Sequence, residues 1–386
     1  MRSGWTVTAV VMALASVPGA VGAAKSPETP AAGPVAYIVM DADSGTVLAE
    51  SNADKQWPPA SMTKMMTVLL ALERVRSGQA SLDEPVTTSA RASKTGGSQV
   101  YLAQGETFPL RDMLSAIMIA SANDASVAVA EHLAGSTEAF VQLMNQRAKQ
   151  LGLTGTVYQS PHGLPPAPGQ TADLTTARDL ATLGRELMKF PEAMQWAGTS
   201  EQGFRNNTFQ MRNTNHLVRT YAGATGLKTG YYAQAGFCVT ASAKRGDLHV
   251  IAVVLGVPNK ERSFAEAARL MSEAFANWQV IVAARRGVPV GTVPVSGGTD
   301  TTVKAMPVQD LRLLVKRADD KGIAVEARVP RLVTAPVAPR QPMGEVVVRR
   351  GDQELGRVAV VADAEVASAG WMAWLWSRGG SAVAQP

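Results

Sequence analysis

The sequence contains little that would cross-link a fold or hold a metal ion. Its 386 residues include one cysteine and four histidines, at positions 132, 162, 216 and 249. A single cysteine excludes an intramolecular disulfide bond. The histidines lack the spacing of metal ligands, and no Gly-rich segment has a phosphate-loop pattern. We therefore expect no metal and no other cofactor.

The cysteine and one histidine are the residues that could be mistaken for catalytic groups. Cys238 lies in the apolar stretch Phe237–Val239, which favours a small core residue over a reactive thiol. His162 stands in a loop rich in proline and glycine. We interpret it as structural rather than as a catalytic base.

No block of like charge interrupts the chain. The formal net charge is +5, and the lysines and arginines are scattered. This pattern argues against a nucleic-acid partner and leaves a weak preference for anionic surfaces such as lipid or cell-wall polymer. Hydrophobic residues make up 46% and charged residues 18%, values that are ordinary for a globular protein and argue against disorder. The length suggests two domains or one large one.

The chain also lacks an apolar run of the roughly 20 residues that a membrane-spanning helix needs. The longest apolar segment, Val7–Val17, follows Arg2 and ends at Pro18 and Gly19. Small residues at Val21–Ala23 then suit signal peptidase. We predict a signal peptide over residues 1–23, cleaved rather than kept as an anchor. The mature protein is then exported, and its N-terminus, residues 24–34, is flexible.

Hydrophobic periodicity predicts an α+β domain over residues 35–284. A segment apolar on all sides, Met65–Leu72, indicates a central buried helix. Amphipathic helices are expected around residues 110–134, 138–150 and 175–188, and a closing helix over 262–279. Strands are expected at 35–40, 46–49, 237–243 and 248–255.

Composition changes in the last quarter of the chain. Short Val-rich stretches separated by Gly, Pro and Asp predict a β-rich domain over residues 285–364, with a turn at Arg349–Asp352. In residues 365–386, Trp371, Trp374 and Trp376 share a wide apolar arc of a helix. Tryptophan is common at membrane interfaces, so we favour a membrane-surface anchor over packing on the β domain.

Three short motifs point to nucleophilic catalysis. Ser61–Lys64 is an SxxK motif, Ser121–Asn123 is an SxN motif, and Lys228–Gly230 is a KTG motif. A trio of this kind marks penicillin-binding proteins and class A β-lactamases. A second KTG, Lys94–Gly96, precedes the SxN motif and enters a Gly-rich loop, so we interpret it as coincidence.

The chemistry needs these residue types at this spacing. Positions i and i+3 share a helix face, so the amine of Lys64 can reach the hydroxyl of Ser61. Lysine serves as a base only when neutral, and both burial and a second cation such as Lys228 favour the neutral form. If Ser61 were only a helix cap and Lys64 a solvated side chain, the other two motifs would have no explanation.

The remaining motif residues suit substrate handling. We expect Ser121 to relay a proton to the leaving amine. Asn123 is expected to hold Lys64 and a substrate amide, and Lys228 with Thr229 to bind a terminal carboxylate. Gly230 is expected to let a ligand backbone lie close to its strand.

The segments around the motifs resemble serine-type D-alanyl-D-alanine carboxypeptidases, which are low-molecular-mass penicillin-binding proteins. The resemblance rests on Pro58–Thr67, Ser121–Ala125, Gly226–Tyr231, Ser160–Leu164, Gly97–Ser98 and Val253–Gly256, and extends through the β domain and the Trp-rich tail.

The resemblance implies a penicillin-binding/β-lactamase-like transpeptidase domain, a small all-β domain and a short C-terminal amphipathic segment. It implies an oxyanion hole from the backbone N–H groups of Ser61 and Tyr231. The implied substrate is the peptidoglycan pentapeptide stem, with β-lactams as covalent inhibitors. The implied location is the periplasm, at the outer face of the cytoplasmic membrane.

Two positions depart from the family pattern. Tyr232 stands where the family often has threonine. Ser263 occupies the position of the usual arginine before Phe264, so Arg262 is only a tentative carboxylate-binding residue.

Three other functions remain open. A DD-endopeptidase acting on cross-links would use the same residues. A β-lactamase would need a glutamate that holds the hydrolytic water, and none occurs between residues 159 and 182. A non-catalytic wall-binding protein is disfavoured by the intact Ser61, Lys64 and Lys228.

Overall fold

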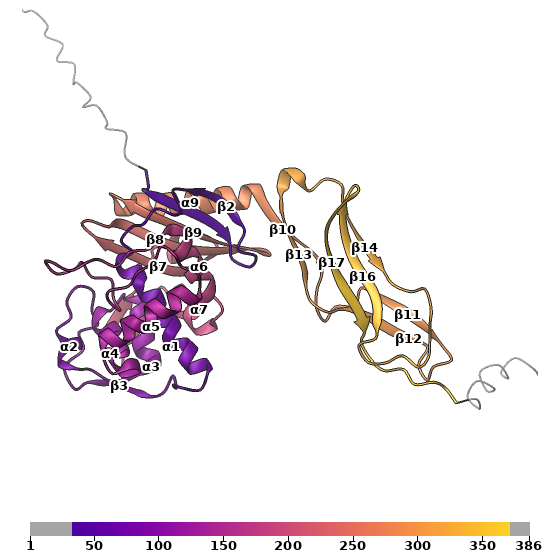
Figure 1. Cartoon of the computed structure of the whole chain (residues 1–386), viewed down its shortest axis with the longest axis horizontal. Coiled ribbons are helices and arrows are strands. Elements are labelled where there is room, and N and C mark those ends of the chain that lie inside the picture. Colours follow the sequence, from indigo (N-terminus) through magenta and orange to yellow (C-terminus); the bar gives the residue numbers. More distant parts are fainter. Residues whose placement is uncertain (1–32, 371–386) are drawn as a thin grey trace, which may run out of the picture. The chain divides into compact units, whose positions relative to one another are not determined.

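The computed structural model describes residues 33–370. The predicted signal peptide, nearly all of the predicted flexible N-terminus and the Trp-rich segment from residue 371 onward lie outside the described residues. Figure 1 traces the described chain from its first strand to the C-terminal strands.

A five-stranded antiparallel sheet forms the centre of the first part of the chain. Its strand order is β2-β1-β9-β8-β7. The central strands β8 and β9 are buried over most of their length, as expected for apolar segments covered on both faces. The bounds are β1 Ala36–Asp41, β2 Val47–Ser51, β7 Ala224–Tyr232, β8 Gly236–Arg245 and β9 Leu248–Val257.

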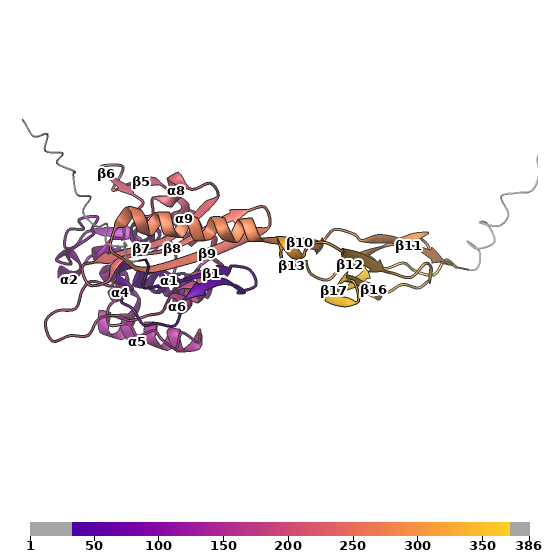
Figure 2. The same ribbon diagram turned by 90° about the horizontal axis from the view of Figure 1, so that it is seen from above.

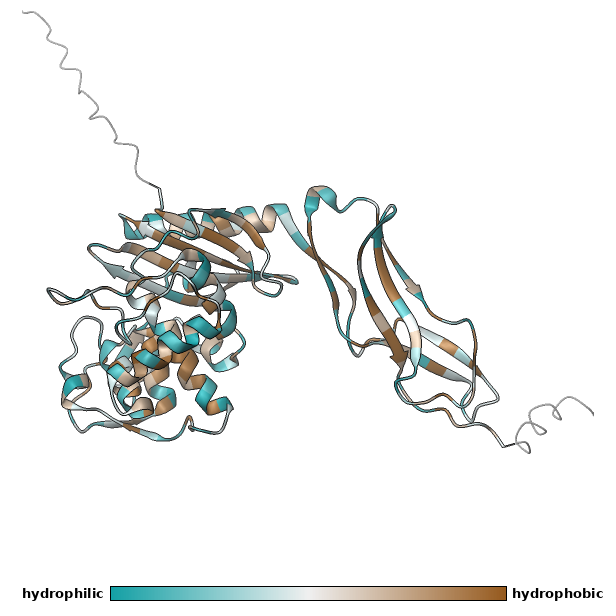
Figure 3. Cartoon of the chain, viewed as in Figure 1, coloured by the Kyte–Doolittle hydropathy of each residue, from teal (hydrophilic) through white to brown (hydrophobic). Residues whose placement is uncertain are grey.

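Helices cover both faces of this sheet (Figure 2). On one face, α1 Lys64–Arg76 lies among α3 Leu110–Ile119, α4 Asn123–Ala134, α5 Thr137–Gln150 and α6 Ala177–Leu187, and their apolar sides form a large core. On the other face, α9 Lys260–Asn277 packs against β8 and β9 and closes a second core. The hydrophobic residues follow these strands and the helix sides that face them (Figure 3).

The helical region expected around residues 110–134 contains two helices. The chain leaves α3 after Ile119 and enters α4 at Asn123. Between them Ser121 has a φ of +62°, in the left-handed region that ends a right-handed helix. The break therefore falls at the serine of the SxN motif, and the apolar pattern continues through it because both helices face the same core.

Strand β10 lies at the predicted boundary between the two domains. The closing helix ends at Asn277, and β10 Trp278–Ala284 follows directly. The prediction assigned this segment to the catalytic domain. It pairs with β13 Leu311–Lys316 rather than with the five-stranded sheet, and Ala284 belongs to the core of the C-terminal strands. Trp278 and Val280 in the first part of β10 pack against the second core, whereas Ala284 at its end belongs to the third. The predicted boundary after residue 284 stays a prediction.

The C-terminal strands form a separate β structure, which confirms the predicted all-β domain. A six-stranded sheet has the order β14-β16-β17-β12-β11-β15 around a third core. The predicted turn at Arg349–Asp352 connects β16 and β17 as an antiparallel hairpin. The bounds are β11 Gly291–Ser296, β12 Thr302–Pro307, β14 Ile323–Arg328, β15 Val333–Thr334, β16 Pro342–Arg350 and β17 Gln353–Ala362, with the 3-10 turn η2 Arg317–Asp319 before β14.

Smaller elements surround the catalytic region. Two short hairpins pair β3 with β4 and β5 with β6. Across the described ranges no helix is long and apolar enough to cross a lipid bilayer. The bounds are η1 Ala60–Thr63, α2 Ala90–Ser93, β3 Pro85–Thr87, β4 Thr107–Pro109, α7 Pro191–Gly198, β5 Glu201–Phe204, β6 Phe209–Arg212 and α8 Leu217–Thr220.

Candidate active site

Ser61 lies in a tight turn at the entrance to the central helix. The 3-10 turn η1 spans Ala60–Thr63 and runs directly into α1, which begins at Lys64. Ala60, the residue before the serine, has a φ of +48°. A non-glycine residue in this region is strained, and such strain is common where a backbone must present a reactive group. Ser61 lines a cavity of about 420 Å³.

The amine of Lys64 lies beside the Ser61 hydroxyl, and the Lys64 side chain is not exposed to solvent. Its Nζ is 2.9 Å from Oγ of Ser61 and donates to the carbonyl oxygen of His162 at 2.6 Å. Burial is the main cause that lowers the pKa of Lys64 well below its ordinary value, and the charge of Lys228 lowers it further. The residue thus has the geometry that a general base requires, and both causes favour its neutral form.

Lys228 comes from the edge strand β7 and is equally buried. Its Nζ donates to the carbonyl oxygen of Thr229 at 3.2 Å. Burial lowers the pKa of Lys228 to about 7. The charge of Lys228 acts on Lys64, so the lysines of the SxxK and KTG motifs lie close enough to interact.

Gly230 brings β7 against the nucleophile turn. A Cβ atom on Gly230 would overlap the carbonyl oxygen of Pro59 and lie 3.1 Å from the backbone nitrogen of Ser61. The glycine was expected to make room for a ligand backbone. A glycine is required here because the backbone of the protein's own nucleophile turn lies so close. Gly230 also lines the cavity.

The SxN motif contributes one side chain to the cavity. Ser121 lines it from the break between α3 and α4. Asn123, the first residue of α4, instead donates from Nδ2 to the carbonyl oxygen of Gly96 at 2.7 Å. Among residues 33–370 the hydrogen bonds of Lys64 go to Ser61 and His162, so the contact expected from Asn123 is not formed.

Several cavity residues were missed by the sequence analysis. Thr214 belongs to no motif, yet its hydroxyl accepts from Thr229 Oγ1 at 2.7 Å. The ring of His216 stacks on Phe264 at 5.1 Å. The polar run Asn213–His216 just before the KTG strand was the available signal. The cavity is lined by Ser61, Ser98, Ser121, Arg212, Asn213, Thr214, His216, Thr229, Gly230, Tyr231, Phe237, Cys238, Lys260, Ser263 and Phe264.

Comparison with known proteins decides the family. Residues 23–259 match the family described as D-alanyl-D-alanine carboxypeptidase. The chain is 34% identical to the D-alanyl-D-alanine carboxypeptidase DacF of Bacillus subtilis over 88% of this chain and 87% of the relative. It is 33% identical to DacC of Escherichia coli over 93% of this chain and 90% of the relative. This chain belongs to the D-alanyl-D-alanine carboxypeptidase family.

The C-terminal strands match a second family. Residues 282–368 match the C-terminal domain of penicillin-binding protein 5. The crystal structure of penicillin-binding protein 5 from Haemophilus influenzae aligns with a TM-score of 0.67 and 27% identity, over 88% of this chain and 99% of that one. Both the carboxypeptidase family and the low-molecular-mass penicillin-binding architecture expected from the motifs are confirmed. The chain is a serine-type hydrolase of this family.

The carboxypeptidase departs from the pattern of its family at the start of α9. Lys260, Ser263 and Phe264 line the cavity, whereas Arg262 does not. The backbone N–H of Arg262 instead donates to the Asn259 side chain that caps the helix. The tentative assignment of Arg262 as a carboxylate ligand stays a prediction.

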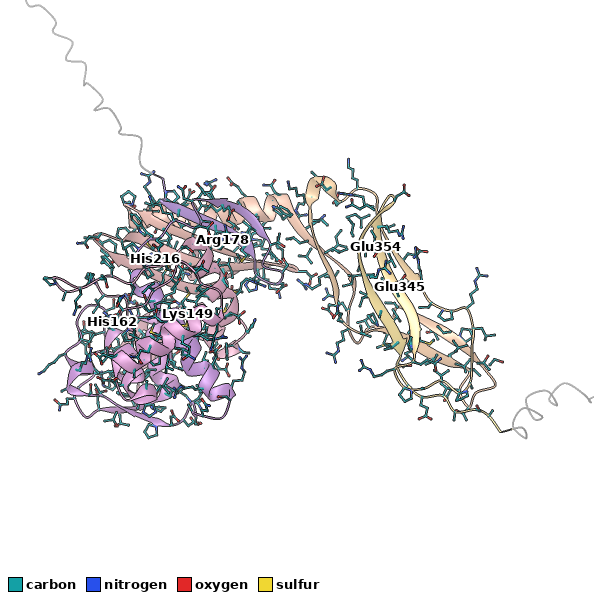
Figure 4. All side chains as sticks on the ribbon, in the orientation of Figure 1. Lys149, His162, Arg178, His216, Glu345 and Glu354 are labelled. Carbon is teal, nitrogen blue, oxygen red and sulfur yellow. The ribbon has the colours of Figure 1, made fainter. Side chains whose placement is uncertain are left out.

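His162 and Cys238 both take structural places in the carboxypeptidase. His162, labelled in Figure 4, accepts at Nδ1 from the backbone of Leu164, and burial lowers its pKa to about 3. Cys238 belongs to the core, and burial raises its pKa to about 12. A histidine with so low a pKa is neutral but too weak a proton acceptor to serve as a base near neutral pH. A thiol with so high a pKa is not ionised, as a thiolate nucleophile must be.

Proposed function

We propose that this chain removes the terminal D-alanine from peptidoglycan pentapeptide stems through an acyl-enzyme on Ser61. The observation that carries the proposal is the buried amine of Lys64 at 2.9 Å from the Ser61 hydroxyl, with Lys228 lowering its pKa. A hydroxyl beside an uncharged amine in a dry setting is an activated nucleophile.

The acylation step follows from this arrangement. Neutral Lys64 accepts the Ser61 proton while Oγ attacks the carbonyl carbon of the penultimate D-alanine. The backbone N–H groups of Ser61 and Tyr231 would stabilise the resulting oxyanion. The C–N bond then breaks, and the proton passes from Lys64 through Ser121 to the leaving amine of D-alanine. Water hydrolyses the ester by the reverse proton path and releases the shortened stem.

The terminal carboxylate of the substrate would bind at the KTG end of the cavity. Thr229 and its partner Thr214 supply hydroxyls there, and Lys228 supplies a buried amine. Since Ser263 stands in place of the usual arginine, the cations on the cavity wall are Arg212 and Lys260. Either can attract an anionic chain end into the cavity. Asn123 would bind a substrate amide after its side chain leaves Gly96.

Penicillins would acylate the same serine and remain bound as covalent inhibitors. Efficient hydrolysis of the penicilloyl ester needs a carboxylate that activates water. Between residues 159 and 182 the acidic residues are Asp173 and Asp179, and both are buried and occupied by hydrogen bonds to the protein. This observation favours a penicillin-sensitive carboxypeptidase over a β-lactamase.

We also propose that the enzyme is exported to the periplasm and attached to the outer face of the cytoplasmic membrane. The proposal rests on the signal-like residues 1–23 and on the Trp-rich residues 371–376. In this arrangement the β domain would hold the catalytic domain near the peptidoglycan.

Labelling with a fluorescent penicillin tests the nucleophile. We expect wild type and Ser77→Ala, a serine at the far end of α1, to be labelled equally, and Ser61→Ala to be unlabelled. Release of D-alanine from a pentapeptide then identifies a carboxypeptidase, and cleavage of a cross-linked dimer identifies an endopeptidase. Labelling of Ser61→Ala would refute the assignment of the nucleophile.

A further inference from the structure

Asp173 is a buried carboxylate behind the catalytic turn that has no part in the acylation step. It is 5% exposed and precedes Leu174, which forms an isolated bridge with Val157. Burial raises its pKa above the ordinary value, and the hydrogen bonds it accepts offset part of that rise. A carboxylate in such a place is costly unless its partners compensate.

The partners of Asp173 come from two segments that meet at the active site. Oδ1 accepts from the backbone N–H groups of Gln159 and Ser160. Oδ2 accepts from the hydroxyls of Ser160 and Thr63, each at 3.0 Å. Thr63 is the residue before Lys64 in the nucleophile turn. The carboxylate thus ties the loop that begins at Gln159 to the turn that carries the catalytic lysine.

The loop in turn delivers two carbonyl groups to α1. Ser160 Oγ accepts from the N–H of Gly163 at 2.8 Å, which curls the loop. The carbonyl oxygen of Pro161 then accepts from Thr67 Oγ1 at 2.7 Å, and that of His162 accepts from Lys64 Nζ at 2.6 Å. Figure 4 labels His162 on this loop. The acceptor that orients the catalytic amine is held in place through Ser160 and Asp173.

The donors around Asp173 favour its ionised form. The two backbone N–H groups on Oδ1 are donors only, and Ser160 Oγ already accepts the N–H of Gly163. A proton on the carboxyl group would displace one of these hydrogen bonds. An ionised carboxylate accepts all four, and such charge-assisted bonds are stronger than neutral ones.

We propose that Asp173 is a positioning residue of the active site, whose buried carboxylate holds the His162 carbonyl against Lys64. The inference rests on the proposed role of Lys64 as the base. Other titratable groups also act on these two residues. Lys64 is faced by Lys228 on β7, by Asp124 on α4 and by the ring of His162. Asp173 is faced by Tyr158 and Tyr232. Burial and Lys228 lower the pKa of Lys64, whereas Asp173 and Asp124 raise it.

A variant that removes the charge of Asp173 but keeps the shape of its side chain separates the positioning role from simple packing. In Asp173→Asn the pKa of Lys64 should fall further, so the acid limb of the penicillin acylation rate should move to lower pH by on the order of one unit. The matched control is Asp179→Asn. Asp179 is similarly buried and accepts from Thr156 and Gly155, but it does not act on Lys64. Its acid limb should stay at the wild-type position.

A second variant tests the positioning through Ser160. Ser160→Ala keeps the charge of Asp173 and removes the link to Gly163, so acylation should slow roughly tenfold without a shift of the acid limb. The proposal would be overturned if the acid limb of the acylation rate lay at the same pH in Asp173→Asn as in Asp179→Asn. It would also be overturned if Ser160→Ala were acylated at the wild-type rate. If wild type itself is not labelled at Ser61, the proposed function fails instead.

Discussion

At the scale of single residues, the active site depends on two buried lysines whose amines donate to uncharged partners. Lys64 and Lys228 have no solvent exposure, and both have a lowered pKa. Each is protonated in the unfolded chain at neutral pH. The catalytic site is therefore expected to cost folding free energy, a cost that enzymes commonly accept at functional sites.

Replacing Lys228 by methionine should stabilise the protein while it inactivates the enzyme. Folding lowers the pKa of Lys228 from its ordinary 10.5 to about 7, so the unfolded chain binds more protons between these values. Wild-type stability should then rise with pH through this window. The lost hydrogen bond to Thr229 offsets part of the gain. We expect Lys228→Met to gain about 2 kcal/mol at pH 7 or below, and the gain to vanish near pH 10.5.

Urea unfolding at several pH values measures this difference. The control is Lys94→Met in the second Lys-Thr-Gly sequence, where Lys94 is exposed and no pH-dependent gain is expected. A Lys228→Met variant that is less stable than wild type at pH 6, or whose gain does not change with pH, would contradict the expectation.

At the scale of elements, the loop from Gln159 to Leu164 must fit closely against η1. Gly163 has a φ of +77°, and a Cβ atom there would overlap the carbonyl oxygen of Ala60. Alanine at this position has to push the nucleophile turn or the loop away. Since the same loop supplies the acceptor for Lys64, the displacement should reach the catalytic pair.

Gly163→Ala is therefore expected to reduce the second-order rate of penicillin acylation by about tenfold to a hundredfold. Gly169 offers a matched control in the following segment. It has a similar φ of +83°, but a Cβ atom there would meet no other described atom within 4 Å. Gly169→Ala should lose only about 1 kcal/mol of stability. Equal acylation rates in the two variants would refute the close fit.

At the scale of the whole molecule, the described residues form a catalytic structure with two cores around one sheet and a β structure with its own core. Catalysis is assigned to the first of these. Among residues 33–370, those that line the cavity around Ser61 all precede β10. A role in placing the enzyme suits a β structure that has a separate core and no share in the site.

Deleting residues 371–376 tests the proposed attachment. The shortened protein should move from the membrane fraction to the soluble fraction after cell lysis, because three tryptophans of the apolar arc are lost. Its rate of penicillin acylation should equal that of wild type. A shortened protein that remains with the membrane would show that the tail is not the anchor.

The local sequence pattern was enough to find the motifs and to predict the buried helix and an α+β domain followed by a β domain. The SxxK spacing places a serine and a lysine on one helix face wherever that helix lies, and period-two apolar stretches predict strands in isolation. The predicted strands at 237–243 and 248–255 lie within β8 and β9, and the closing helix within two residues of α9.

Tertiary structure alone decided which distant groups meet. Nothing in the local sequence places Asp173 beside Thr63, sends Asn123 to Gly96, or pairs β10 with β13. Hydropathy records whether a residue is buried, whereas the partner of a buried polar group depends on how segments far apart in the chain pack together.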